Sequence, residues 1–208
     1  MRVLAIDTCL DACQAALISI DEVVFARSEP MHRGHQERLA PMLAEAMAAA
    51  GSRFAELDRI GVTVGPGSFT GLRVGLAFAK GLAIARQIRC VGVGVLEALA
   101  VGVDGRVLAA IDARRDQVYL QLFDGGRAMG EPEAVLLEDA GDWISRHGGS
   151  EGLTVTGSGA PLLAGLSARL LPLAAPDPVA IARIAAADPA TAPARPIYLR
   201  APDARLPA

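Results

Sequence analysis

The sequence predicts an α/β protein of two duplicated lobes, each a mixed sheet with flanking helices. The segment Ala-Ile-Asp at 5–7 recurs at 110–112, and Val-Thr-Val-Gly-Pro-Gly at 62–67 recurs as Thr-Val-Thr-Gly-Ser-Gly at 154–159. The two landmarks come in the same order within matching strand and helix patterns, which indicates duplication of one lobe. At 208 residues, 52% hydrophobic and 21% charged, the chain is long enough for two small cores.

The first lobe is predicted over residues 1–103. Apolar runs separated by short polar turns predict a meander of strands at 3–6, 12–20 and 22–27. Apolar side chains then recur at helical spacing over 36–50, and Gly51 ends that helix. The lobe continues with a strand at 60–64, a glycine turn at 65–71, a helix at 69–85, a strand at 90–93 and a helix from 96 onward.

The second lobe is predicted over residues 104–187. Asp177-Pro178 supplies an N-cap and a first-turn proline for its last helix. The following residues, 188–208, form an Ala- and Pro-rich tail that is expected to dock back on a lobe through 197–199. In order, the lobe has a strand ending at Asp112, a strand at 117–123 and a helix at 142–147. A further strand and the second glycine turn follow at 154–159, then a helix opened by Pro161 and the last helix at 179–187.

The stretch Gly-Pro-Gly-Ser-Phe-Thr-Gly at 65–71, between an apolar strand and an apolar helix, is the most informative motif. Such a turn either aims backbone N–H groups at an anion or lets two backbones approach closely. It does not match the nucleotide-binding motifs. A Walker loop needs a lysine directly after its last glycine, and the dinucleotide fingerprint needs a glycine where Thr70 stands.

The helix predicted over 69–85 is apolar around nearly its whole circumference. Gly71, Gly75 and Ala79 recur every four residues and form a smooth stripe on which another helix could pack. The charged residues of the segment exclude a membrane span. Two interpretations are open: a central helix enclosed by its own lobe, or a helix whose second side is covered by a partner.

The candidate catalytic side chains have simpler interpretations. His32 and His35 could share a metal on a helix, but no third ligand is evident and both precede the helix body. Ser68 does not have the spacing of a hydrolase nucleophile and is expected to cap the following helix, whereas His147 suits a helix C-terminus. The sequence therefore predicts no metal site and no catalytic residue.

Composition limits the function further. A net charge of −3 and an aromatic content of 4% argue against autonomous nucleic-acid binding, which needs clustered cations and stacking rings. Three cysteines without a Cys-x-x-Cys pair indicate neither a disulfide framework nor a zinc site. Asp7 interrupts the first apolar run, and no long uncharged apolar stretch occurs, so we expect a cytoplasmic protein without a membrane span.

Five segments of the chain resemble the bacterial TsaB (YeaZ) family nearly end to end. They are 1–8, 35–41, 65–75, 110–114 and 198–200, and the block at 65–75 is long and specific. The resemblance implies the actin-like ATPase (RNase H-like) fold for both lobes. It also implies a noncatalytic scaffold or dimerization subunit that binds and activates TsaD. The complex would transfer a threonylcarbamoyl group to N6 of adenosine 37 in tRNAs that read ANN codons.

The same resemblance implies the partners. TsaD would form a heterodimer with this chain and supply the metal and the transfer chemistry. The ATPase TsaE would join a larger assembly, and the chain alone would form a homodimer. The tRNA would be bound only indirectly, no cofactor is expected, and a nucleotide at the joint between partners is left open.

The predicted partner-binding surface lies on the helices at 69–85 and 36–50. Its expected residues are Gly65, Gly67, Ser68, Phe69, Gly71, Leu72, Arg73, Gly75, Leu76, Ala79, Arg38, Leu39 and Met42.

Asp7 and Asp112 stand where active members of that fold carry carboxylates in phosphate-binding hairpins. The turns at 7–13 and 112–117 contain no glycine, so side chains would crowd a triphosphate, and Arg114 would have to swing away or become a ligand. We interpret both aspartates as degenerate phosphate-site positions that bind their own turns, with general-base or metal roles as alternatives. The alternative function is an actin-fold ATPase or small-molecule kinase acting on its own. A metallopeptidase would need a His-x-x-x-His pair that the chain lacks.

Overall fold

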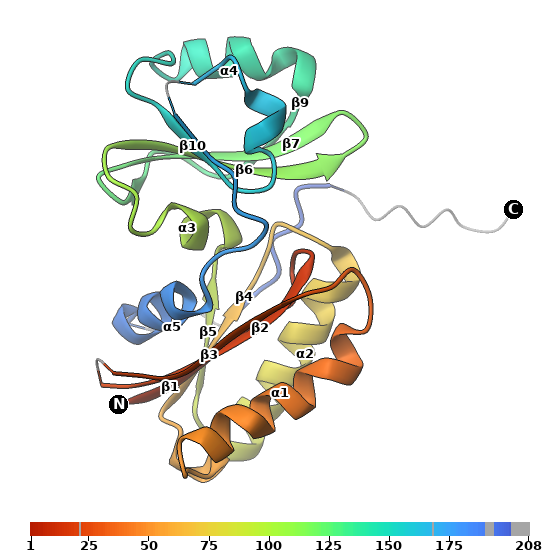
Figure 1. Cartoon of the computed structure of the whole chain (residues 1–208), viewed down its shortest axis with the longest axis vertical. Helices are drawn as coiled ribbons and strands as arrows, with labels where there is room; N and C mark the ends of the chain where they lie inside the picture. Colours follow the sequence, from red (N-terminus) through yellow and green to blue (C-terminus); the bar gives the residue numbers. More distant parts are fainter. Residues whose placement is uncertain (21, 168, 190–193, 201–208) are drawn as a thin grey trace, which may run out of the picture.

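The computed structural model of the chain describes residues 1–20, 22–167, 169–189 and 194–200. Two mixed sheets lie toward opposite ends of the long axis, with helix α3 between them (Figure 1). This arrangement confirms the two-lobed α/β fold that the repeated landmarks predict.

The first sheet is formed by the N-terminal half of the chain in the order β3-β2-β1-β4-β5. Strand β1 pairs antiparallel with β2 and parallel with β4, so the predicted meander leads into a parallel half. Alternate residues of β1 face the two sides of the sheet, and both sides are buried. The strands are β1 Arg2–Asp7, β2 Ala12–Ser19, β3 Glu22–Pro30, β4 Arg59–Thr63 and β5 Arg89–Val93.

The second sheet repeats this topology in the order β11-β10-β6-β7-β8, with β9 also pairing with β7. Strand β6 pairs antiparallel with β7 and parallel with β10, as β1 does with β2 and β4. Short strands β8 and β9, which the sequence analysis did not predict, extend the antiparallel side. The strands are β6 Arg106–Arg114, β7 Gln117–Asp124, β8 Arg127–Ala128, β9 Glu133–Leu136, β10 Thr154–Thr156 and β11 Arg169–Leu171.

The two glycine turns occupy equivalent places in the two lobes. Gly65 and Gly157 both have a left-handed backbone, with φ of 96° and 99°, which favours glycine. After each turn the chain contacts the first strand of its lobe or the turn directly after it: Ser68 N–H donates to Cys9 O of the β1–β2 turn at 2.7 Å, and Gly159 N–H donates to Ala110 O of β6 at 3.0 Å. The turns therefore serve close backbone approach, one of the two readings of the motif.

Helices α1 and α2 cover one face of the first sheet, and α5 covers the other. Helix α3 packs on β6 and β7 of the second sheet, and α4 packs near β9. The helices are α1 His35–Ala49, α2 Phe69–Arg86, α3 Val95–Ala100, α4 Ala140–Arg146 and α5 Pro178–Ala187. The short 3-10 helices are η1 Phe54–Glu56, η2 Leu137–Asp139 and η3 Ala160–Leu163.

The placement of α5 and α3 corrects the assignment of helices to lobes. Division at residue 103 puts α3 with the first lobe and α5 with the second, whereas each helix packs on the sheet of the other lobe. Close packing explains the position of α5, because a Cβ on Gly61 of β4 would lie 2.5 Å from the Cβ of Ala185. Arg59 fixes the end of the helix by donating from Nη1 to Ala185 O at 2.6 Å.

The helix expected after the second glycine turn is shorter than predicted. Only the 3-10 helix η3 follows β10, with Pro161 at its start, and Gly165 with φ of 118° lies just beyond it. The predicted tail contact at 197–199 is confirmed: Ile197 N–H donates to Val64 O at 2.7 Å, and Ile197 and Leu199 pack against the main core. Residues 190–193 and 201–208 of the predicted tail lie outside the described residues.

One apolar cluster connects the lobes. It extends from beneath α1 and α2, through Leu96 and Leu99 of α3, to Ile111 and Phe123 of the second sheet. Among the described residues, no helix is long and apolar enough to cross a membrane.

Candidate functional site

The cleft between the lobes has a volume of about 440 Å³. Its walls come from the β1–β2 turn, the start of α2, the end of β6 and the segment that ends at Arg200. This is the cleft in which the degenerate phosphate-site positions were expected, so its side chains decide whether it suits a nucleotide.

Asp7 lies beneath the cleft wall and is fully buried. Its Oδ1 accepts hydrogen bonds from Thr63 Oγ1 at 2.6 Å and from Cys9 N–H at 2.9 Å, whereas its Oδ2 has no partner among the described residues. Burial raises the pKa of the Asp7 carboxyl, and the bonds from Thr63 and Cys9 partly oppose that shift. Asp7 therefore binds its own turn and the neighbouring strand, as the interpretation of a degenerate position proposed.

Arg114 lines the cleft on the side of the second lobe. Its backbone N–H and its Nη1 contact the Asp112 carboxylate at 2.7 and 3.1 Å, and its Nη2 reaches Asp11 Oδ2 in the first lobe at 3.3 Å. The guanidinium thus joins the two hairpins in which phosphate-binding loops would be needed. The sequence prediction did not include Asp11. Asp11 and Arg114 carry opposite charges and lie in corresponding turns of the two lobes, and that signal could have indicated the pair.

These residues do not fit a magnesium–nucleotide complex. One aspartate is buried, the other is bound to Arg114, and neither hairpin has the glycines that would let backbone amides reach phosphates. Among the described residues, no group of three or more His, Cys, Asp or Glu side chains could hold a metal ion.

The histidines and serines have structural places. His32 Nδ1 lies 3.1 Å from Asp11 Oδ1, and His35 is the first residue of α1. Ser68 is the N-cap of α2 and accepts from Gly71 N–H at 3.3 Å, which confirms its predicted capping role. His147 is the C-cap residue of α4, as expected for a helix C-terminus.

The stripe of small residues on α2 faces its own sheet, which corrects the prediction that another helix packs there. Thr8 Oγ1 donates to Gly71 O at 2.7 Å, and a Cβ on Gly71 would overlap the Thr8 carbonyl oxygen. A Cβ on Gly75 would lie 2.7 Å from Thr8 Oγ1, and Ala79 is fully buried. Periodicity locates such a stripe but does not say whether the covering element belongs to the same chain.

Several other predicted contact residues are also enclosed by the subunit, so their assignment as direct contacts is corrected in the same way. They support the helices from beneath and cannot touch a partner while this fold is kept. The enclosed residues are Gly65, Leu72 and Leu76 near and on α2, and Leu39 and Met42 on α1. Gly67 is half-buried at the turn, where a Cβ would overlap Cys9 O.

The opposite sides of α1 and α2 are open to solvent. We call them the outer helix face and define it by ten of the exposed residues of the two helices: Ala40, Pro41, Ala44 and Ala48 of α1 and Phe69, Thr70, Arg73, Ala77, Gly81 and Ile84 of α2. Ile84 is 77% exposed, which is unusual for a large apolar side chain in a helix. Helix α2 is therefore not enclosed on all sides, and the interpretation of a wholly internal helix is wrong.

Of the predicted contact residues, Ser68, Phe69 and Arg73 are exposed at the start of α2. The predicted contact residues did not include the exposed alanines of both helices, Gly81 or Ile84. These side chains are small or isolated in the sequence. The helical period that marked Gly71 and Gly75 as one side implies Ala77 and Gly81 on the other, and that signal could have found them.

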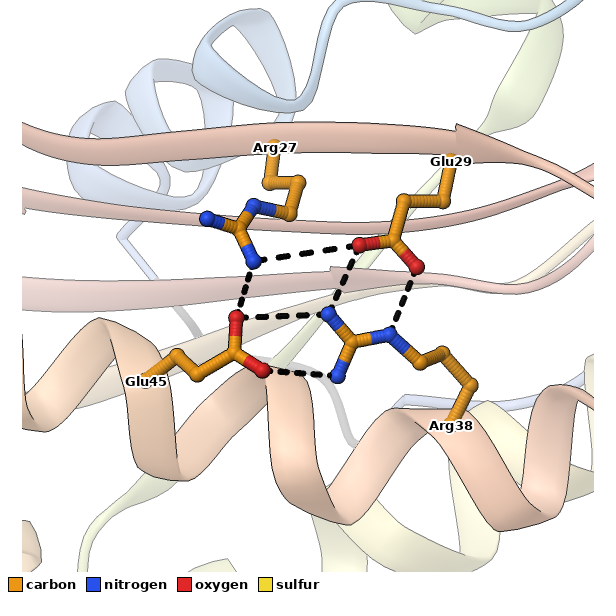
Figure 2. Close-up of polar contacts among 4 residues, drawn as sticks. All are labelled: Arg27, Glu29, Arg38 and Glu45. Carbon is orange, nitrogen blue, oxygen red and sulfur yellow. Dashed lines mark hydrogen bonds and ion pairs between the residues drawn. The ribbon is translucent and has the colours of Figure 1, made fainter.

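Arg38 joins α1 to the edge strand β3. Figure 2 shows its guanidinium between two carboxylates: Nε and Nη2 bind Glu29 at 2.6 and 2.7 Å, and Nη1 binds Glu45 at 2.9 Å. Arg27 contacts the same two glutamates. Hydrogen bonding and charge from Arg38 hold the pKa of Glu29 and of Glu45 below the usual range. The donors of Arg38 are used within the subunit, although this residue was predicted to contact a partner.

The fold and the cleft together define a class: a two-lobed protein of the actin-like ATPase fold whose two hairpins beside the cleft contain no glycine. The fold is shared with the activator of 2-hydroxyisocaproyl-CoA dehydratase from Clostridium difficile, solved with bound ADPNP. That structure has a TM-score of 0.54 and 8% identity, and the match covers 89% of this chain and 93% of that chain.

Comparison with known proteins identifies the family within this class. The tRNA threonylcarbamoyladenosine biosynthesis protein TsaB of Escherichia coli K12 is 36% identical over 221 aligned residues, covering 96% of this chain and 95% of that protein. The YeaZ structure from Pseudomonas aeruginosa has a TM-score of 0.80 and 29% identity, covering 95% of this chain and 99% of that chain. The chain belongs to the TsaB family of tRNA threonylcarbamoyladenosine biosynthesis proteins. A family model described as TsaD, tRNA N6-adenosine threonylcarbamoyltransferase, also matches residues 22–142.

Proposed function

We propose that this chain is a noncatalytic subunit that binds and activates a TsaD-type transferase through the outer helix face. The pair would transfer a threonylcarbamoyl group to N6 of adenosine 37 in tRNAs that read ANN codons, with a TsaE-type ATPase in a larger assembly. The transferase would supply the catalytic groups, and this chain would act in the cytoplasm.

The observation that carries the proposal is the exposed apolar surface of two adjacent helices. On α2 the exposed residues Ala77, Gly81 and Ile84 are uncharged, and no heavy atom lies within 4 Å of where a Cβ on Gly81 would stand. Along α1 the exposed residues Ala40 and Ala44 are equally small. Helices bearing small side chains can approach closely, and burying such a surface against a partner is favourable.

The match to the TsaD family model supports the choice of partner. The matched range, 22–142, contains both α1 and α2, so a TsaD-type protein is expected to carry a related pair of helices. Two related helix pairs can meet face to face about an approximate two-fold axis. The same geometry would join two copies of this chain when the transferase is absent, which is the basis for proposing a homodimer.

A noncatalytic role agrees with the cleft. Arg114 bridges Asp112 and Asp11 and so joins the two hairpins that would have to bind phosphates, which disfavours an ATPase or kinase acting on its own. We expect isothermal titration of the isolated chain with MgATP to give no binding tighter than about 1 mM. A micromolar dissociation constant for MgATP would restore the ATPase hypothesis.

A reconstitution tests the proposal directly. The TsaD-type enzyme of the same organism is incubated with threonylcarbamoyl-adenylate and an ANN-decoding tRNA, with and without this chain, and the modified nucleoside is measured by mass spectrometry. We expect product when both proteins are present and little or none with either alone. Full product without this chain, or product formed by this chain alone, would refute the proposed role.

A further inference from the structure

Arg73 stands at the N-terminal end of the outer helix face, held by two aromatic side chains. Its guanidinium carbon lies 3.8 Å from the centroid of the Phe69 ring, one turn earlier on α2. Its Nε donates to the hydroxyl of Tyr198 at 3.4 Å. The Tyr198 ring in turn lies 5.5 Å from the Phe69 ring. Arg73 is thus positioned by its own helix and by a segment far along the chain.

No carboxylate neutralises Arg73 within the described part of the chain. Arg38 and Arg114, by contrast, each contact two carboxylates. Tyr198 receives the Nε hydrogen bond, and among the described residues no partner is found for Nη1 or Nη2 of Arg73. The side chain is exposed, so these donors are hydrated in the isolated subunit.

The position of Arg73 makes this lack of a counter-charge significant. Arg73, Ala77 and Gly81 recur every four residues along the exposed line of α2, and Arg73 is the charged member of that line. A protein that covers the line would remove water from the guanidinium. Removal of water from an unpaired charge is costly, whereas a carboxylate matches the guanidinium fork and forms strong hydrogen bonds.

We propose that Arg73 binds an aspartate or glutamate carboxylate of the protein that docks on the outer helix face. The inference rests on the proposed function, because it assigns a specificity contact to that docking. Stacking on Phe69 and the bond to Tyr198 hold the guanidinium before the partner arrives, which lowers the entropy lost on binding. Phe69 and Tyr198 are positioning residues, and the Nη1 and Nη2 groups of Arg73 make the contact.

The test measures the affinity of the full chain for the TsaD-type subunit of the same organism by isothermal titration at low and high salt. For Arg73→Gln we expect affinity to fall by about 10- to 100-fold and to depend less on salt. Arg73→Lys should recover part of the affinity because it keeps the charge but not the fork. Arg86→Gln is the matched control: Arg86 is an exposed arginine at the other end of α2, and its removal should change affinity by less than about threefold.

Each outcome is decisive. If the parent chain binds and Arg73→Gln binds equally well, the carboxylate contact is refuted and the proposed function stands. Equal losses for Arg73→Gln and Arg86→Gln would indicate a general effect of charge and would also refute the contact. If the parent chain itself does not bind, the proposed function fails together with this inference. Melting temperatures of all variants within about 2 °C of the parent would show that the fold is kept.

Discussion

At the residue scale, Gly71 and Gly81 lie on the same helix in opposite surroundings. A Cβ on Gly71 would overlap the backbone oxygen of Thr8, whereas a Cβ on Gly81 would meet no heavy atom within 4 Å. We therefore expect Gly71→Ala to lower the free energy of unfolding by about 2 kcal/mol or more. Gly81→Ala should raise it by about 0.5–1 kcal/mol, because alanine favours the helix.

Urea denaturation measures the free energy of unfolding of both variants. The two values can be compared directly because the same substitution is made at two positions of α2. If Gly71→Ala is as stable as the parent, the inward packing of the stripe of small residues is contradicted. Gly75 also lies against Thr8, so a long side chain there would disturb the fold itself.

Asp7 gives a prediction about pH. Burial raises the pKa of its carboxyl above 3.8 in the folded protein, so between that value and the raised pKa the folded state binds more protons than the unfolded state. The contribution of Asp7 to stability therefore falls as pH rises through this window. Asp7→Asn removes the titration and keeps an oxygen to accept from Thr63 and Cys9.

The measurement is urea denaturation of the parent and of Asp7→Asn from pH 4 to pH 7. We expect the stability of Asp7→Asn relative to the parent to increase with pH. Other carboxylates, such as Glu29 and Glu45, shift in the opposite direction but are shared by both proteins and cancel in the difference. A difference that decreases with rising pH would show that Asp7 is stabilised as a carboxylate.

At the scale of elements, Arg38 links α1 to β3 through Glu45 and Glu29. Because these side chains are partly exposed, the link should be modest and sensitive to salt. We expect Arg38→Ala and Glu45→Ala to lower the melting temperature non-additively at low salt, with the coupling between them reduced at 0.5 M salt. Full additivity at low salt would mean that the contacts in Figure 2 do not stabilise the position of α1.

Local patterns predicted most elements, because the strands of the meander, α1, α2, α4 and α5 each carry their own period or cap. Asp177, for example, caps α5 by accepting from Val179 N–H at 2.9 Å. Local patterns could not say which sheet a helix covers. The contact of α5 with β4 depends on Gly61, more than a hundred residues earlier in the chain, and no spacing rule connects the two.

The candidate site was predicted in part for a related reason. The sequence identified α2 and the start of its exposed side, at Phe69 and Arg73, but selected Gly71 and Gly75 from the side that packs inward. Small residues occur on both sides of the helix, and only the position of Thr8 decides between them. Tyr198 could not be placed beside Arg73, since that contact depends on how the last segment crosses the fold.

At the scale of the whole molecule, two lobes of one topology are held together by a continuous core and by the Arg114 bridge. The bridge lines the cleft, and the outer helix face remains open on the far side of the first sheet from α5. We propose a division of roles on this basis: the cleft takes no part in the chemistry, and the outer helix face binds another protein.

The most direct test of this account places an arginine on each side of the first sheet. Ala77 of α2 and Ala187 of α5 are both exposed helical alanines, so Ala77→Arg and Ala187→Arg add the same charge and volume. Binding to the TsaD-type subunit of the same organism is measured by isothermal titration. We expect Ala77→Arg to weaken binding at least about tenfold and Ala187→Arg to bind like the parent. Unchanged binding by a folded Ala77→Arg variant would contradict docking on the outer helix face.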